Sequence, residues 1–436
     1  MFVPLRVRAS AVRVFGVAFT LFLAATPLAL AQDGNAGAPP PPQQPPPIVI
    51  ERPAGLFGDP KVLARGIDYV TERLGDDFGE PTSGFYPELS NMVTGSGWIS
   101  AGPGYRQYFS DGNVMLDGSA AVSWHLYTMA QGRIEFPKLA NGRLLVGAQG
   151  MWRDQTQLSY FGLGPDVTDD DRSQYRLQVH DVVGYASLST TDWLSFTGEF
   201  GWLGKPKVMA PSGPFPGDFP DVRDAFPFDP AVSLSDQPNL YHSEAAVVVD
   251  TRDYHGHPTR GFRYRAALTN YTDQSTGVFS YRQYEAEGTH FIPITDTHWV
   301  LAFRGWSVFS DVPVGHDIPF YLLPAIGGHN TLRAYSNGQF KERNLLVANA
   351  EARLGLTAHI DGAVFFDAGN VAARYSDLNL DKTSFGVGMR LHTEKTTFAR
   401  LDVAHGSEGW RFVFRTSDPL RLARGRRRVA EIPFLP

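Results

Sequence analysis

The sequence predicts an all-β fold, an antiparallel transmembrane β-barrel, and three observations carry this prediction. From about residue 94 onward, apolar and polar residues alternate along many short segments, as they do in strands that have one apolar and one polar face. Glycine (44 residues) and aromatic residues (13%) are abundant, which favours strands joined by many turns. The chain opens with a secretory signal and contains no cysteine. A length of 436 residues fits one large barrel as readily as two or three compact units.

Residues 1–31 have the features of a signal peptide. Three arginines precede the apolar residues 14–25, and the small side chains of Ala29-Leu30-Ala31 permit cleavage before Gln32. These arginines are the only charged side chains of the segment, so its removal makes the mature chain more acidic than its formal net charge of −6. An acidic chain has no electrostatic support for binding nucleic acid, and a chain without cysteine has no disulfides or thiolate metal sites.

Short segments flank the expected barrel. Residues 32–58 are rich in proline and indicate a disordered linker. Residues 59–92 begin with Asp59 and Pro60, which suit the N-cap and first position of a helix. We expect this short amphipathic helix to pack at the periplasmic end of the barrel, with a plug or an interfacial anchor as the alternative. Residues 417–436 form a basic tail, which is disordered by default and otherwise contacts anionic headgroups or a periplasmic partner.

Residues 93–416 are expected to form the barrel itself. Residues 384–392 alternate apolar with polar or small side chains, and the closing strand does the same, with Trp410, Phe412 and Phe414 on its apolar face. About fourteen such segments can be counted, a number typical of membrane barrels. No segment after the signal reaches the ~20 consecutive apolar residues that a membrane-spanning helix needs.

Connector lengths distinguish a membrane barrel from an ordinary soluble sheet. Short connectors such as residues 139–143 alternate with long ones such as residues 210–230. Short periplasmic turns and long outer loops produce this asymmetry in outer-membrane barrels. A secreted sandwich or a propeller is the alternative, but no blade-sized repeat is present.

A family resemblance rests on several motifs that occur in a fixed order. A hairpin motif over residues 250–261 resembles the periplasmic hairpin of the bacterial surface antigen family, which supplies the barrel of the BamA/TamA outer-membrane assembly and translocation superfamily. Its matching residues are Asp250, Arg252, Asp253, Pro258, Thr259 and Gly261. Further along, Leu332, Arg333, Ala334 and Tyr335 resemble the loop-tip signature of that superfamily. The strands around Glu351 and Asp367, residues 385–391 and the closing strand complete the order.

The resemblance implies sixteen strands and a latch inside the lumen. In this family an outer loop folds back into the barrel, and its arginine pairs with acidic residues of the inner wall; the matching residues here are Arg333, Glu351 and Asp367. Strand parity independently places Glu351 on a polar face, and a carboxylate facing lipid would cost a few kcal/mol. The alternative is that the three side chains are solvated lumen charges without mutual contact.

Departures from the family pattern qualify what the resemblance implies. Ala334 replaces the usual glycine of the loop tip, so a Cβ enters a tight turn. The chain before the barrel is too short for periplasmic POTRA repeats, and the tail of residues 417–436 extends beyond the strand at which the family usually ends. We therefore expect a short form without POTRA domains.

The function that the resemblance implies is assistance in inserting or translocating polypeptide, or lipid, at the outer membrane of a Gram-negative bacterium. A weakly paired seam would template an incoming strand, and we expect it between residues 98–108 and 410–416. The expected partners are the lipid bilayer, lipopolysaccharide and client polypeptides, while the sequence identifies no periplasmic partner. A passive channel or structural barrel that has lost the assembly activity is the alternative.

Other candidate chemistry is weaker. Asp253, His255 and His257 are close enough in sequence to hold a metal, but a polar hairpin turn explains them better, so no metal site and no cofactor are predicted. The acidic residues 166–171 are expected to form a solvated outer loop, or else to bind divalent cations.

No G-x-S-x-G, H-E-x-x-H or phosphate-loop motif is present, so the chain is not expected to be an enzyme. The remaining alternative is a barrel hydrolase whose catalytic residues come from separate strands.

Overall fold

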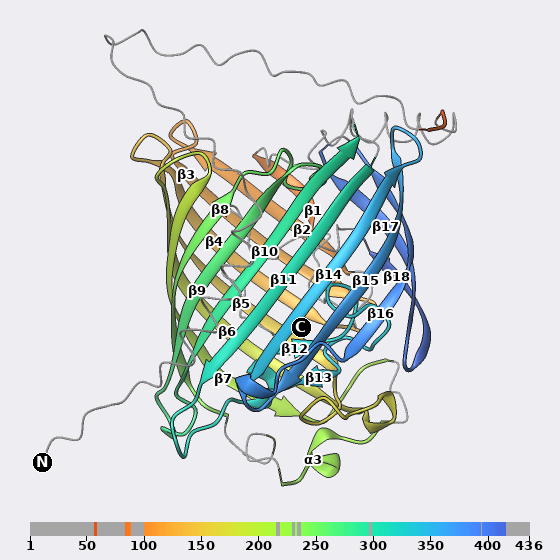
Figure 1. Ribbon diagram of the computed structural model, residues 1–436. Helices are drawn as coiled ribbons and strands as arrows, with labels where there is room; N and C mark the ends of the chain where they lie inside the picture. Colours follow the sequence, from red (N-terminus) through yellow and green to blue (C-terminus); the bar gives the residue numbers. More distant parts are fainter. Residues whose placement is uncertain are drawn as a thin grey trace, which may run out of the picture. The chain divides into compact units, whose positions relative to one another are not determined.

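The described part of the chain consists mostly of strands, which wind into a barrel of tilted β-strands (Figure 1). This computed structural model describes residues 56–58, 83–88 and 100–415, apart from residues 215–218, 229–231, 233–236, 296–298 and 394. All of them belong to one unit, residues 52–436. The predicted signal peptide, most of the linker, the helix and the basic tail lie outside the described residues.

Within the described residues, sixteen strands form the main sheet and two more form a separate ribbon. The strands are β1 (Gly84–Glu88), β2 (Ser100–Phe109), β3 (Val114–Ser123), β4 (Thr128–Leu139), β5 (Leu144–Tyr160), β6 (Ser173–Ser189), β7 (Leu194–Met209), β8 (Leu240–Asp250), β9 (Gly261–Asp273), β10 (Tyr281–Thr295), β11 (Trp299–Asp311), β12 (Ala325–Ile326), β13 (Phe340–Lys341), β14 (Asn344–Gly355), β15 (Ile360–Ala372), β16 (Lys382–His392), β17 (Thr397–Gly406) and β18 (Gly409–Arg415). One short helix, α3 (Val222–Ala225), lies in the connection from β7 to β8.

The sheet is an antiparallel meander in which each strand pairs with its neighbours in the chain. β14 follows β11 in the sheet, because β12 and β13 pair with each other inside the intervening loop. The predicted count of sixteen strands is confirmed. The alternation also has the predicted sense: Phe385, Val387 and Met389 are exposed on the outside, as are Trp410 and Phe412 of β18.

The edges of the sheet correct the predicted seam. The segment near residues 98–108 contains β2, which is not an edge strand, because β2 pairs with β1 on one side and with β3 on the other. β1 is the edge strand, and it lies within residues 59–92, for which the sequence predicts only the helix and a lead-in. Five residues that include Gly84 and Pro87 are too few to show an alternating pattern. The two edges of the sheet are therefore β1 and β18.

Connection lengths differ between the two ends of the barrel. Short turns join β2 to β3 and β4 to β5, and in the second of these Ala140 and Asn141 adopt left-handed backbone angles (φ 49° and 57°) before Gly142 (φ 80°). The long connections lie at the other end, which is the lower end in Figure 1, together with α3. Among the helices of the described residues, none has the length and apolar character needed to span a bilayer.

An apolar cap fills the barrel mouth at the long-loop end. The loop from β11 to β14, residues 312–343, contributes Ile318, Phe320, Tyr321, Leu322 and Leu323, all at most 3% exposed. They pack against buried side chains carried by the strands, which include Tyr160, Tyr175, Leu177, Tyr271 and Tyr281. Burial of each large apolar side chain contributes about 1.5–3 kcal/mol. The cap therefore holds the first half of this loop in the mouth and directs its second half into the lumen.

Candidate functional site

The loop tip of residues 327–335 carries Arg333 into the barrel interior. Gly327 and Gly328 begin the tip with φ of 110° and 89°, a left-handed region that favours glycine. A Cβ on Gly327 would lie 2.3 Å from the carbonyl oxygen of Ser336, so the two arms of the loop approach closely here. The backbone N–H of Gly328 donates to Leu332 O, and that of Tyr335 donates to the same carbonyl. These turns place Arg333 at the inner wall.

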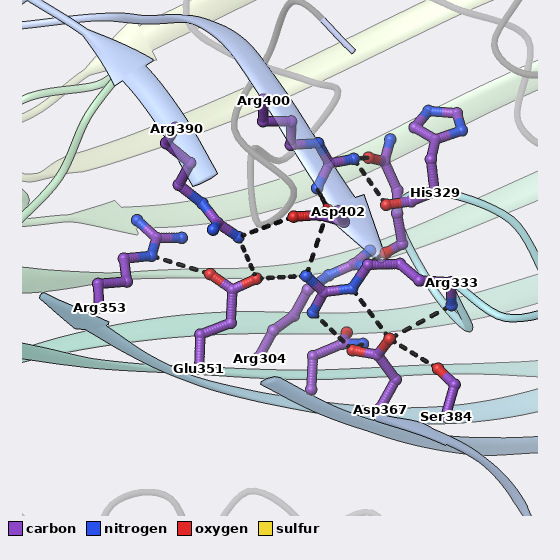
Figure 2. Close-up of polar contacts among 12 residues, drawn as sticks. Arg304, His329, Arg333, Glu351, Arg353, Asp367, Ser384, Arg390, Arg400 and Asp402 are labelled. Atoms are coloured by element: carbon purple, nitrogen blue, oxygen red, sulfur yellow. Dashed lines mark hydrogen bonds and ion pairs between the residues drawn. The ribbon is translucent and has the colours of Figure 1, made fainter. Parts of the chain in front are cut away.

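Arg333 binds two carboxylates of the inner wall, as Figure 2 shows. Its Nε and Nη2 atoms donate to Asp367 on β15, at 3.0 and 2.8 Å, and its Nη1 donates to Glu351 on β14 at 2.7 Å. All three residues are at most 2% exposed. Burial alone would lower the pKa of the Arg333 guanidinium, but Asp367 and Glu351 outweigh burial and raise that pKa above its usual value. The arginine therefore remains charged inside the barrel.

Neighbouring side chains hold Asp367 and Arg333 in this geometry. Asn349 Nδ2 and Ser384 Oγ donate to Asp367 at 2.8 and 2.9 Å. The guanidinium carbon of Arg333 lies 3.4 Å from the ring centroid of Phe365, a cation–π contact. Both oxygens of Asp367 and one face of the guanidinium thus have partners, so the pair is fixed in position as well as in charge.

Further charges extend the network around this pair. Glu351 also accepts from Arg390 Nη2 at 2.8 Å and from Arg353 Nε at 2.9 Å. Asp402 on β17 lies 3.6 Å from Arg333 Nη1 and 3.3 Å from Arg400 Nη1. The network thus joins four arginines to three carboxylates. Removing one partner from such a buried set leaves an uncompensated charge and typically costs about 3–5 kcal/mol.

Side chains of the wall also hold the loop backbone just before Arg333. Arg400 Nη2 donates to His329 O at 2.7 Å, Arg304 Nη1 donates to Asn330 O, and Asn349 Nδ2 donates to Thr331 O at 2.7 Å. Three successive carbonyls are therefore bound by three different strands, β17, β11 and β14. Sequence reasoning missed Asp402, Arg400 and Arg304. The partners of Arg353 and Arg390 were likewise not evident from the sequence.

The remaining loop-tip residues contact the last hairpin of the sheet. Leu332 is fully buried in an apolar cluster, and Tyr335 OH donates to Thr383 O at 3.2 Å and lies 3.0 Å from Ser407 Oγ. Ala334, which replaces the family glycine, is not among the residues with positive φ. A Cβ on Gly406 of β17 would lie 2.8 Å from the Ala334 Cβ. The glycine at 406 therefore leaves room for the side chain at 334.

The acidic loop covers the latch from the long-loop end. Asp169 accepts from Ser336 Oγ at 2.5 Å and pairs with Arg172. Arg172 also donates to Ser336 Oγ at 2.7 Å, and Gly164 N donates to Lys341 O at 2.8 Å. The acidic loop was expected to be solvated, but Asp169 docks it in part on residues 312–343, which we call the latch loop.

The predicted hairpin at residues 250–261 folds on itself. Asp250 accepts two bonds from Arg252, at 2.9 and 2.7 Å, and Asp253 accepts from the backbone N–H of Thr259 at 3.0 Å. A Cβ on Gly261, whose φ is 92°, would lie 2.4 Å from Thr251 O. Pro258 is buried in the same turn.

The structure does not bring Asp253, His255 and His257 together. The side chain of His255 is 73% exposed and lies 3.7 Å from Asp250. His257 is buried and contacts Asp361, while Asp253 binds Thr259. The metal alternative for these three residues therefore has no geometric support.

A sixteen-stranded antiparallel barrel with a loop fixed in its lumen by a buried arginine defines a class of transmembrane barrels with an internal latch. A family model described as the Omp85 superfamily domain matches residues 207–406, which include the hairpin and the whole latch. Residues 207–406 thus resemble the Omp85 superfamily domain, and the barrel is of the BamA type in its fold.

A solved structure of BamA shares this fold. A structure of BamA from Haemophilus ducreyi lacking POTRA domains 1–3 is 15% identical, with a TM-score of 0.54 over 76% of this chain and 68% of that one. CdiB from Acinetobacter baumannii and CdiB from Escherichia coli are 12% and 11% identical, with TM-scores of 0.43 and 0.45. The alignments cover 72% and 77% of this chain and 56% and 60% of those chains. The chain thus spans about half to two thirds of the length of these proteins.

Proposed function

We propose that this barrel assists the insertion or translocation of polypeptide, or of lipid, at the outer membrane of a Gram-negative bacterium. Its signal peptide would be removed before Gln32, and its apolar outer face would contact the bilayer and lipopolysaccharide. The activity itself would reside at the seam between β1 and β18, where an incoming strand could pair with free backbone groups.

The observation that carries this proposal is the weakness of the β1 edge. β1 has five residues and pairs with β2 over five positions, whereas most strands of the sheet have ten or more. Pro87 lies opposite Pro103, and neither has an N–H to donate, so this position of the ladder lacks its donors. No backbone ladder joins β1 to β18 within residues 83–88 and 100–415 as far as they are described.

A crosslinking experiment tests the seam. Because the chain has no cysteine, a single introduced cysteine is unique. We choose Phe85→Cys on β1 and Phe412→Cys on β18, with Phe200→Cys on β7 as the matched control, since all three side chains face outward. With a urea-unfolded outer-membrane protein that carries one cysteine, added to proteoliposomes, disulfides should form at 85 and 412 and not at 200. Equal crosslinking at all three positions, or none at 85 and 412, would contradict the proposal.

The passive channel is the rival function. The apolar cap and the latch loop both occupy the lumen, which favours a closed barrel over an open pore. A steady single-channel current from the reconstituted wild-type barrel, together with no crosslink at the seam, would favour the channel instead.

A further inference from the structure

A separate group of chemistry-bearing side chains lies at the short-turn end of the barrel. His257 belongs to the turn between β8 and β9, Asp361 to the start of β15, and His392 to the end of β16. In the sheet, β10, β11 and β14 separate β9 from β15. The turn must therefore reach past three strands to meet Asp361 and His392, and the backbone N–H of Thr397 holds it there through Gly256 O at 3.2 Å.

The three donor atoms face one another in a buried site. His257 Nε2 lies 3.2 Å from Asp361 Oδ2, and His392 Nε2 lies 3.1 Å from Asp361 Oδ1. All three ligand atoms lie within 4.8 Å of one another. The histidine side chains are 2% and 1% exposed and that of Asp361 is 11% exposed, so the carboxylate is largely shielded from water.

The far nitrogen of each imidazole has its own oxygen partner. His392 Nδ1 donates to the carbonyl oxygen of Thr393 at 2.9 Å, and His257 Nδ1 lies 2.9 Å from Thr397 Oγ1. A carbonyl can only accept, so His392 carries a proton on Nδ1 and directs Nε2 at Asp361. Histidines that bind metals have this arrangement, in which an outer oxygen fixes the tautomer and the ring orientation.

The geometry points to a metal-binding site formed by His257, Asp361 and His392. It would hold a divalent transition metal ion, for example Zn²⁺. Two imidazole nitrogens and one carboxylate suit zinc, nickel, cobalt or copper, whereas magnesium and calcium prefer oxygen ligands alone. Three protein ligands leave a fourth position for water. The ion would tie the turn after β8 to the ends of β15 and β16.

Metal binding requires one local adjustment. The two imidazole rings are stacked, with centroids 3.9 Å apart and planes 6° from parallel. For both nitrogens to reach one ion at about 2.0–2.1 Å, the rings must turn so that their lone pairs converge. A proton shared between a histidine and Asp361 would satisfy the present geometry without any turn, so the experiment must separate metal from proton.

The test uses the whole folded barrel in detergent, treated with chelator and then titrated with Zn²⁺ alone by calorimetry at fixed pH. We expect one high-affinity ion per chain, a rise in the thermal midpoint with zinc concentration, and a visible absorption band when Co²⁺ replaces Zn²⁺. His257→Gln and His392→Gln should each weaken binding at least about tenfold. His255→Gln, in the same turn but with an exposed side chain, should leave it unchanged.

Several outcomes would overturn the site. These are the absence of stoichiometric zinc binding by the wild-type barrel, equal weakening in the His255→Gln control, or unchanged binding in both ligand variants. A midpoint that responds to pH but not to zinc would assign the cluster to a proton. If His392→Gln fails to fold, His257→Gln decides the question, because His257 lies in a turn and not in a strand. The result is independent of the seam experiment, so either proposal can fail alone.

Discussion

At the residue scale, a few buried charges determine where the lumen loop lies. Arg333 is bonded to Glu351 and Asp367, and every one of these groups is shielded from water. The wall presents these carboxylates among several further arginines, so the site is selective for a cation with the fork geometry of a guanidinium. The position of the loop therefore depends more on the side chain of Arg333 than on the length of the loop.

Arg333→Gln should release the loop. The substitution leaves Asp367 without its two-bond partner in a buried site, at a cost of about 3–5 kcal/mol. Limited proteolysis of the folded barrel should then cleave within residues 312–343 much faster than in the wild type. The matched control is Arg343→Gln, in the same loop, because its pair with Asp317 is exposed and contributes about 0–1 kcal/mol. Equal cleavage rates in the two variants would contradict the latch.

The buried ammonium of Lys341, which destabilises the docked loop, predicts that the stability of the barrel depends on pH. Burial lowers the pKa of its ammonium to about 8, from 10.5 when the loop is undocked. Below pH 8 the docked loop buries a charge, at a cost on the order of 3 kcal/mol, and this cost disappears as the pH rises from 8 to above 10.5. Lys341→Met should therefore raise the thermal midpoint of the barrel at pH 7, and the gain over wild type should shrink by pH 10. A gain that does not change with pH would contradict this account.

At the element scale, the latch loop connects strands that are distant in sequence. It is bonded to β14 and β15 through Arg333, to β11 through Arg304, and to the β17–β18 hairpin through Tyr335 and Gln339. The hairpin is the edge that the seam proposal requires. The loop thus supports the last strands from inside, while their outer face carries exposed apolar side chains.

Gly406→Ala tests this contact between loop and hairpin. The new Cβ would lie 2.8 Å from the Ala334 Cβ and 3.2 Å from Thr383 O, so the loop tip must shift, at a cost of about 1–3 kcal/mol. Ala334→Gly removes the closer of these two contacts. The double variant Ala334→Gly/Gly406→Ala should therefore recover part of the loss in thermal midpoint, which is a positive coupling in a double-mutant cycle. Strictly additive effects would show that the two positions do not touch.

At the scale of the whole molecule, the barrel separates an apolar exterior from an interior filled by loops and ion pairs. The apolar cap leaves the mouth occupied at the long-loop end, and the latch loop lies beneath it. A barrel of sixteen strands is wide enough to hold such a loop. We therefore expect its permeability to depend on the loop and not on the strand number.

Replacing residues 318–323 with glycine and serine should open the barrel. The change removes five cap residues, so the reconstituted variant should show larger and more frequent current steps than the wild type in planar bilayers. The matched control is the same replacement over residues 375–380, which lie in the loop between β15 and β16, outside the cap. A steady current in the wild-type barrel, unchanged by the first replacement, would show that the cap does not close the lumen.

The sequence by itself determined most of the strands and their faces, while its resemblance to a known family supplied the candidate latch residues. Alternation follows from the two-residue period of a strand, so Phe412 and Phe414 could be assigned to the outside and Glu351 to the polar face from parity alone. The pairing of Arg333 with Glu351 and Asp367 came from resemblance, since spacing along the chain contains no information about a contact across a lumen.

The tertiary structure alone decided which side chains meet across strands. Asp402 and Arg400 join the network, and Asp361 meets His392 and His257, because register and barrel curvature bring together residues up to 135 positions apart. β1 could not be predicted from the sequence either, because five residues that include a proline show no alternating period. Such a strand forms only where β2 offers an edge to pair with. Local periodicity specifies elements, whereas contacts between elements depend on how the sheet closes, which no short stretch of sequence encodes.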